Sequence, residues 1–323
     1  MLFEQSEEEN EELYPWATQF IKAMHNGFWT DGEFNFQSDI QDFKVNLTEE
    51  ERGVIVRNLS AISQVESVVK QFWNRLGDHF PHKNLINLGI VVAGTEVVHN
   101  EAYERLLKVL DLKQAIRDNG KEPALANRVK YLGKRNHRYY KDARKHYIHS
   151  MILFTLLVEN VSLFSQFYTV LWFGRYKNVL KDTNQQVLYT KNEELVHGQI
   201  GTKIVNVLRE EYSEMFDDEL EQLVMEEVVR AYEGECELID WILGDYRGER
   251  ISPAILKEFV KSRFNESLVA IGYKAPFILD PSIERDYEWV MEEVLGNNVT
   301  DFFYKRPVDY AKKGKSFSPD DLF

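Results

Sequence analysis

An all-α fold is predicted for this chain of 323 residues. Only 8 prolines and 17 glycines interrupt it, and long stretches contain neither residue, which favours long helices over many short strands. Apolar residues make up 44% of the chain and aromatic residues 13%, enough to fill a large core. In the long stretches the apolar residues recur every three or four positions, as the buried face of a helix requires.

Eight helices follow from this periodicity. They are predicted at residues 10–24, 48–77, 84–111, 125–144, 146–178, 183–211, 217–244 and 253–271. Thr48 and Glu51 have the spacing of a capping box at the start of the second helix. After residue 295 the periodicity stops and Pro, Gly and Ser become frequent. We therefore predict a helical domain at residues 1–295 and a flexible C-terminal tail at residues 296–323.

Composition argues against several classes of function. The formal charge is −14, and no segment concentrates Lys and Arg enough to follow a nucleic-acid backbone. The acidic N-terminus lacks the basic and apolar regions of a secretion signal, and no uninterrupted apolar run reaches the roughly 20 residues of a membrane span. A single cysteine, Cys236, excludes an internal disulfide. We expect a cytoplasmic protein that binds neither nucleic acid nor a membrane.

Four predicted helices carry a glutamate inside their apolar stripe. These stripe residues are Glu66; Glu96 with His99 and Tyr103; Glu159; and Glu194 with His197. An isolated ionised carboxylate in a protein core costs many kcal/mol unless a cation or a metal ion balances it. Our register of the four stripes contains no Lys or Arg, and four carboxylates balance two divalent cations. Metal ions are therefore the favoured counter-charge, and salt-bridged core glutamates are the alternative.

The order of these residues along the chain predicts a dinuclear site. Two helices contribute one Glu each, and the other two contribute a Glu-x-x-His each, with 30 and 35 residues between the members of the two halves. Ferritin-like di-iron and di-manganese helical bundles have this ligand pattern. Oxygen-rich ligands with one histidine per metal also suit iron or manganese better than structural zinc.

Over nearly its whole length the chain resembles the small (β) subunit of class I ribonucleotide reductase. Tyr103, four residues after His99, stands where that family can hold a stable radical. The segment GFWTDGEFNFQSD resembles the family's N-terminal aromatic segment and implies that Trp29 is a relay residue. Glu193 replaces an Asp that in the family links a metal-bound histidine to this tryptophan. In the tail, FFYKRPVDY resembles the segment with the relay tyrosine, here Tyr310, and KSFSPDDLF resembles the peptide that docks on the catalytic α subunit.

Glu66 and Lys70 point to a subclass. Most of the family has Asp in place of Glu66, and a Glu together with the retained Tyr103 resembles the dimanganese subclass (class Id), which superoxide activates. Lys70 lies one turn beyond Glu66 and would attract an anionic oxidant; pairing of Lys70 with a surface carboxylate is the alternative.

The resemblance implies a homodimer whose centre holds two manganese ions, with two iron ions or a Mn/Fe pair as alternatives. This centre would supply an oxidant, by long-range proton-coupled electron transfer, to an α subunit that makes deoxyribonucleotides. A flavodoxin-like activase would deliver superoxide. Two other functions stay open: an oxidase or oxygenase with a small substrate beside the metals, and an iron-storage bundle.

Overall fold

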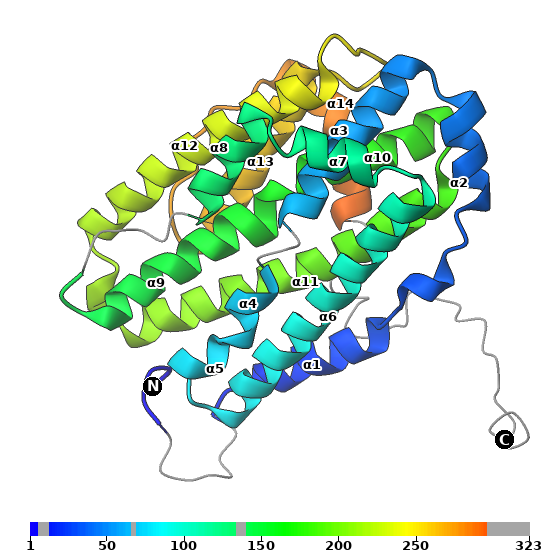
Figure 1. The fold of residues 1–323 in the computed structure, drawn as a ribbon. Helices are drawn as coiled ribbons and strands as arrows, with labels where there is room; N and C mark the ends of the chain where they lie inside the picture. The colour runs from blue at the N-terminus through cyan, green and yellow to red at the C-terminus, as the bar shows by residue number, and fades with distance from the viewer. Residues whose placement is uncertain (6–12, 66–68, 134–139, 296–323) are drawn as a thin grey trace, which may run out of the picture.

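The computed structural model describes residues 1–5, 13–65, 69–133 and 140–295. Regular secondary structure in these residues is helical, apart from an isolated antiparallel bridge between Gly248 and Ile251. Long helices lie side by side in a bundle (Figure 1). The all-α prediction is confirmed.

The long helices of the bundle match most of the predicted ranges. They are α1 (Pro15–Gly27), α3 (Glu49–Val65), α6 (Lys83–Val109), α11 (Lys181–Glu211), α12 (Asp218–Leu243), α13 (Pro253–Ala270) and α14 (Pro281–Leu295). The shorter ones are α2 (Gln37–Gln41), α4 (Val69–Asn74), α5 (Leu76–His79), α7 (Lys113–Asn119) and α8 (Pro123–Gly133). The predicted capping box begins α3, since the Glu51 amide donates to Thr48 Oγ1 over 3.2 Å and the Thr48 amide donates to Glu51 Oε2 over 2.9 Å.

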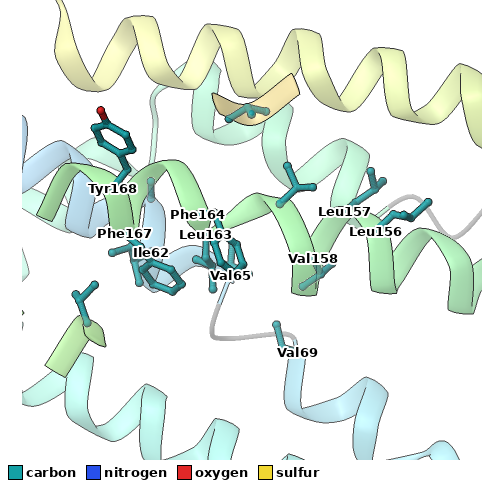
Figure 2. Packing of buried hydrophobic residues seen from close by; sticks show 14 of the residues in the cluster. Ile62, Val65, Val69, Leu156, Leu157, Val158, Leu163, Phe164, Phe167 and Tyr168 are labelled. Atoms are coloured by element: carbon teal, nitrogen blue, oxygen red, sulfur yellow. The ribbon is translucent and has the colours of Figure 1, made fainter. Parts of the chain in front are cut away.

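One long apolar helical rod crosses the middle of the bundle. It consists of α9 (Ala143–Leu153), the π-helix η3 (Phe154–Ser162), α10 (Phe164–Trp172) and the π-helix η4 (Phe173–Lys177). By length and composition this rod could cross a membrane, but 78% of its apolar window is buried inside the protein, so it is the core helix of a soluble protein. Figure 2 shows part of this core, where Phe164 and Phe167 lie beside Ile62 and Val65 of α3.

The predicted helices differ from the structure in two places: one boundary is wrong and one helix is missing. The helix predicted at 125–144 corresponds to α8, but residues 140–142 are not helical. Asp142 instead caps α9 by accepting a hydrogen bond from the Arg144 amide over 2.8 Å. Helix α14 was not predicted, although Tyr287 and Val290 have helical spacing and are buried. The proposed boundary at residue 295 adjoins the tail, which lies outside the described residues.

Close contact between α11 and η3 brings two elements of the predicted site together. A Cβ atom on Gly198 would lie 2.3 Å from Asn160 Oδ1, and one on Gly201 would lie 2.3 Å from Thr155 Oγ1. These distances are too short for any side chain, so the two glycines let the backbone of α11 approach the π-helix. Helix α11 also contacts α6, which packs against α1 and α4.

Candidate metal centre

The structure brings five of the six predicted metal ligands into one buried cluster. Glu96 and His99 come from α6, Glu159 from η3, and Glu194 and His197 from α11, and each is at most 2% exposed. Candidate ligand atoms of the three glutamates and His197 all lie within 4.8 Å of one another. The sixth predicted ligand, Glu66, lies outside the described residues.

Two carboxylates lie between the two histidines. Glu96 places Oε1 2.9 Å from Nδ1 of His197 and Oε2 3.4 Å from Nδ1 of His99. Glu194 does the same in reverse, with Oε1 3.1 Å from Nδ1 of His99 and Oε2 3.4 Å from Nδ1 of His197. Each carboxylate therefore offers one oxygen to each histidine, which is the arrangement of two ligands that bridge a pair of cations.

Glu159 belongs to the His197 half of the cluster. Its Oε2 lies 3.6 Å from His197 Nδ1. Its Oε1 accepts a hydrogen bond of 2.7 Å from Nε1 of Trp73, a fully buried residue of α4. The hydrogen bond fixes the carboxylate and directs one oxygen to the histidine.

Both histidines turn Nδ1 inward and hold Nε2 by an outer hydrogen bond. His99 Nε2 lies 2.6 Å from Oε2 of Glu193. His197 Nε2 lies 3.2 Å from Thr95 Oγ1, whose hydroxyl donates to the Val92 carbonyl over 2.8 Å. Because the Thr95 hydroxyl already donates, it accepts from His197 Nε2–H, and this leaves the Nδ1 lone pair available for a metal ion.

The electrostatics of the cluster reflect uncompensated negative charge. Burial, and then the charge of Glu194, raises the pKa of Glu159 well above its usual value. Burial alone would lower the pKa of His197, but Glu96 and the other carboxylates raise it well above the ordinary range. In Glu194 the effect of burial is outweighed by the nearby imidazoles of His197 and His99, which lower the pKa of the carboxyl. The cluster therefore attracts positive charge.

The residues present fit a pair of divalent cations. Buried Glu96 Oε1 and Oε2, Glu159 Oε2, Glu194 Oε1 and His197 Nδ1 make no hydrogen bond within the part of the chain that is described. Two ligand atoms at right angles around one cation, each bound at about 2.1 Å, lie about 3 Å apart. The measured separations of 2.9 to 3.6 Å match this geometry. Such orphaned buried atoms would otherwise cost free energy.

An aromatic residue flanks each half of the cluster. Trp29 donates from Nε1 to Glu193 Oε2 over 2.8 Å, and its ring stacks on His99 with 6.0 Å between centroids. Glu193 thus connects His99 to Trp29, although it is one methylene longer than the Asp of the family pattern. Tyr103 is buried one turn beyond His99 on α6, on the face that carries Glu96.

Two predicted residues remain, Lys70 and Tyr310. Lys70 Nζ contacts Asn100 Oδ1 of α6 at 3.5 Å, so the alternative that it pairs with a carboxylate gains no support from this contact. Tyr310 lies outside the described residues.

Three residues of the centre's surroundings were not predicted. Thr95 and Trp73 make the hydrogen bonds described above, and Lys191 is fully buried on α11 one turn before Glu194. Lys191 also corrects the expectation that the four stripes lack a basic residue. It lies four residues after Val187 and three before Glu194, so the same spacing rule would have found it, had the stripe been drawn through it instead of through Thr190.

Comparison with known proteins identifies relatives over nearly the whole chain. The family model for ribonucleotide reductase, small chain, matches residues 9–281. The ribonucleoside-diphosphate reductase subunit beta of Halalkalibacterium halodurans is 23% identical over 316 residues, covering 96% of this chain and 90% of that protein. The corresponding subunit beta of Treponema pallidum is 24% identical and covers 97% and 89%.

Solved structures share the fold. A putative class I ribonucleotide reductase from Bacillus halodurans superposes with a TM-score of 0.77 at 22% identity, covering 87% of this chain and 100% of that one. Dimanganese(II)-NrdF of Streptococcus sanguinis gives 0.73 at 14% identity, covering 88% and 99%. An R2-like ligand-binding oxidase with a Mn/Fe cofactor gives 0.68 at 19% identity, covering 81% and 95%. Mn/Mn and Mn/Fe centres therefore both occur in proteins of this fold.

Proposed function

Because this chain belongs to the ribonucleotide reductase small-chain family and is a radical-generating small subunit of ribonucleoside-diphosphate reductase, we propose how its residues hold the centre and pass the oxidant on. The observation that carries the proposal is the pair of carboxylates, Glu96 and Glu194, that each face both histidines. The ligand-binding oxidases are structural neighbours, with a likeness confined to the fold.

Six side chains hold the dinuclear centre. Glu96 and Glu194, which each face both histidines, would offer oxygens to both cations, His99 and His197 would offer Nδ1, and Glu159 would offer an oxygen beside His197. Glu66, which lies outside the described residues, completes the His99 half. Two manganese ions are favoured, with two iron ions or a Mn/Fe pair as alternatives, because these metals accept the same donors. When bound and oxidised, the centre supplies a one-electron oxidant.

Tyr103 holds the oxidising equivalent in this proposal. Burial on the ligand-bearing face of α6 keeps its ring away from solvent reductants. Tyr103→Phe tests the role, because it keeps the ring and removes the phenol. We expect the activated protein to lose a tyrosyl signal in electron paramagnetic resonance (EPR). An EPR signal that is unchanged in Tyr103→Phe would mean that the metal ions, and not Tyr103, hold the oxidising equivalent.

The oxidant leaves through Trp29. The path from His99 through Glu193 to Trp29 is supported by contacts of 2.6 and 2.8 Å, which suit coupled movement of an electron and a proton. Tyr310 in the tail then passes the oxidant to a cysteine of the α subunit, on which the last residues dock. The oxidant is thereby used on a ribonucleotide held by the partner.

Lys70 guides the native oxidant in this proposal. Among the described residues, Lys70 Nζ contacts the neutral amide of Asn100, and this contact does not cancel the ammonium charge that would attract superoxide. A flavodoxin-like activase would deliver the superoxide, as in the dimanganese subclass. Lys70→Gln should slow activation by superoxide in anaerobically metallated protein. Activation by O2 alone, as fast as by superoxide, would contradict the subclass assignment.

A second copy of the chain covers one face of α6. Ile86, Ile90 and Val97 are 38%, 54% and 42% exposed there, and a Cβ atom on Gly94 would have no neighbour within 4 Å. An apolar helix face with a small residue at its centre suits a symmetric contact with its own copy. Ile90→Glu should shift the homodimer to monomer in analytical ultracentrifugation, and an unchanged sedimentation coefficient would argue against this face.

We place the protein in the cytoplasm. The whole proposal is tested by an assay with the matching α subunit. Intact chain and chain truncated after Gly296 are loaded with metal, and deoxyribonucleotide formation is measured. We expect activity from the intact chain and none from the truncated one, with equal metal content in both. Equal activity in the two would contradict the docking and relay roles of the tail.

A further inference from the structure

A second tryptophan touches the centre at the half that the Trp29 path does not serve. Trp73 donates to Glu159 over 2.7 Å, and its ring centroid lies 6.2 Å from that of His197. Trp29 has the matching position at His99, with 6.0 Å between ring centroids. Each histidine therefore has its own tryptophan.

A continuous set of aromatic rings leads from Trp73 to the surface. Phe72 and Phe154 lie 6.0 and 5.6 Å from Trp73 and stack on each other at 3.6 Å. Phe72 lies parallel to Tyr147 of α9, with 6.3 Å between centroids and 10° between planes. Tyr147 is 8% exposed and stacks on the exposed His79 at 3.6 Å. In Figure 1, α4 lies between α6 and α9, as this set of contacts requires.

The ends of this path are the residues that can be oxidised. Tryptophan and tyrosine lose one electron far more readily than phenylalanine. Trp73 and Tyr147 are therefore the residues that are oxidised, and the electron passes between them across Phe72 and Phe154. The hydrogen bond from Trp73 to a carboxylate stabilises positive charge on the oxidised indole. Within the described part of the chain, Trp29 contacts the rings of Phe34 and Tyr189, and neither belongs to the path from Trp73 to Tyr147.

We propose that Trp73 and Tyr147 form a discharge path, which returns an oxidised centre to its reduced state when no α subunit accepts the oxidant. The inference rests on the proposed function, because the oxidant is the one that the small subunit generates. It adds an activity: one-electron reductase chemistry that protects the chain, with a small thiol or ascorbate at the surface as reductant.

The electron count of the path is as follows. Trp73 gives one electron to the oxidised centre and becomes a radical cation. Tyr147 gives one electron to Trp73 and releases its phenolic proton to water. A thiol then gives a hydrogen atom to the Tyr147 radical, and two of the resulting thiyl radicals combine to a disulfide. Per turnover, the centre gains one electron, the thiol loses one hydrogen atom and one proton is released.

Tyr147 is suited to the outer position. Burial, with a smaller contribution from the charge of Asp78, raises the pKa of its hydroxyl, so the phenol keeps its proton until it is oxidised. Tyr147 is 8% exposed and stacks on the exposed His79, so a small reductant can approach within one residue of its ring. Tyr147→Phe removes the oxidisable phenol and keeps the ring that stacks on Phe72 and His79, so this variant is expected to fold.

The experiment measures the lifetime of the oxidised centre without the α subunit. Wild type, Tyr147→Phe and the control Tyr176→Phe, a half-buried tyrosine stacked on Trp172, are activated and mixed with ascorbate. Decay is followed by EPR and absorption. We expect Tyr147→Phe to decay at least fivefold more slowly and Tyr176→Phe to decay as wild type. Peptide mapping after repeated activation without reductant should find oxidation products on Trp73 and Tyr147.

A wild-type decay rate in Tyr147→Phe overturns the path. Trp73→Phe should also slow the decay, and its Mn(II) affinity is measured by calorimetry because Glu159 loses a hydrogen bond in this variant. Deoxyribonucleotide formation is assayed on the same samples with the α subunit. No product from wild type means that the proposed function fails, whereas an active Tyr147→Phe with an unchanged lifetime removes the discharge path alone.

Discussion

Buried glutamates of this protein fall into two groups with different neighbours. Glu51 accepts from the Thr48 amide and lies 2.9 Å from Lys177, and Glu235 lies 3.3 Å from the fully buried Arg128. At the metal centre, Glu96, Glu159 and Glu194 each lie within 4 Å of a histidine nitrogen. The counter-charge in the first group is lysine or arginine, whereas the carboxylates of the second group face imidazoles.

The pKa values follow this difference. Burial would raise the pKa of Glu51, but the Thr48 amide and Lys177 outweigh it, so the pKa is lowered. Glu159 has a raised pKa, because burial and the charge of Glu194 outweigh the effect of His197. Elsewhere the fold places lysine or arginine beside a buried carboxylate, whereas in this cluster three carboxylates face two imidazoles, an arrangement that favours the binding of metal ions.

Removing a bridging carboxylate should have the largest effect. Glu194→Gln keeps the shape but takes a ligand from both halves, and we expect the bound metal to fall from two ions to one or fewer and deoxyribonucleotide formation to cease. Metal analysis and the coupled assay check this. The exposed Glu226→Gln on α12 is the control. Full metal content in Glu194→Gln would show that Glu194 does not bridge.

Breaking the buried ion pair should affect stability and leave metal binding intact. Glu235→Gln removes the carboxylate charge that faces the buried guanidinium of Arg128. We expect a loss of about 3–5 kcal/mol in the free energy of unfolding. Urea unfolding of metal-free protein measures it. Asp240→Asn, which breaks the exposed pair with Lys257, should cost at most about 1 kcal/mol. Equal losses in the two variants would contradict the distinction between buried and surface pairs.

Neutralising Glu193 should have an intermediate effect. Glu193→Gln keeps a hydrogen-bonding group between His99 and Trp29 but removes its charge, and we expect activity or metal affinity to fall by about 10–100-fold. Thr95→Val, which removes the neutral acceptor at His197, should lower metal affinity with a smaller loss of activity. The two variants are compared by Mn(II) calorimetry and the coupled assay. Identical losses would mean that the outer partners of the two histidines are equivalent.

Separating α11 from η3 should cost a moderate amount of stability. In Gly198→Ala the new methyl meets Asn160, and we expect a loss of about 1–3 kcal/mol in urea unfolding. Metal affinity should also fall, because Glu159 moves with η3. Gly53→Ala on α3 meets only the flexible end of Arg57 and should be neutral or stabilising. A stable Gly198→Ala with full metal affinity would show that the close contact is not needed.

The smallest expected effect is the contribution of Glu51 to the pH dependence of the free energy of unfolding. Its folded pKa is lowered, so its contribution to stability is complete above its unfolded pKa and is lost as pH falls through the folded value. Glu51→Gln should therefore be less stable than wild type at pH 7, and the difference should shrink as pH falls below about 4.5. A difference that stays constant down to pH 3 would contradict the assignment.

The predicted ligands could be found from the sequence because their spacing alone puts them on buried helix faces. Glu96 and His99 needed no tertiary information. The π-helix around Glu159 could not be predicted, because its wider turn depends on how closely α11 approaches at Gly198. Trp73 belongs to a predicted apolar stripe. Its hydrogen bond to Glu159 could not be predicted, because the two residues are 86 positions apart in the sequence. Helix α14 could have been predicted, because the buried Tyr287 and Val290 have helical spacing in the sequence.

The most direct test of the account is Mn(II) binding to metal-free wild-type protein, followed together by calorimetry and EPR. Bridging by Glu96 and Glu194 predicts two ions per chain and an exchange-coupled EPR signal that appears as the second ion binds. A single ion per chain, or two ions with the spectrum of isolated Mn(II), would contradict a bridged dinuclear centre.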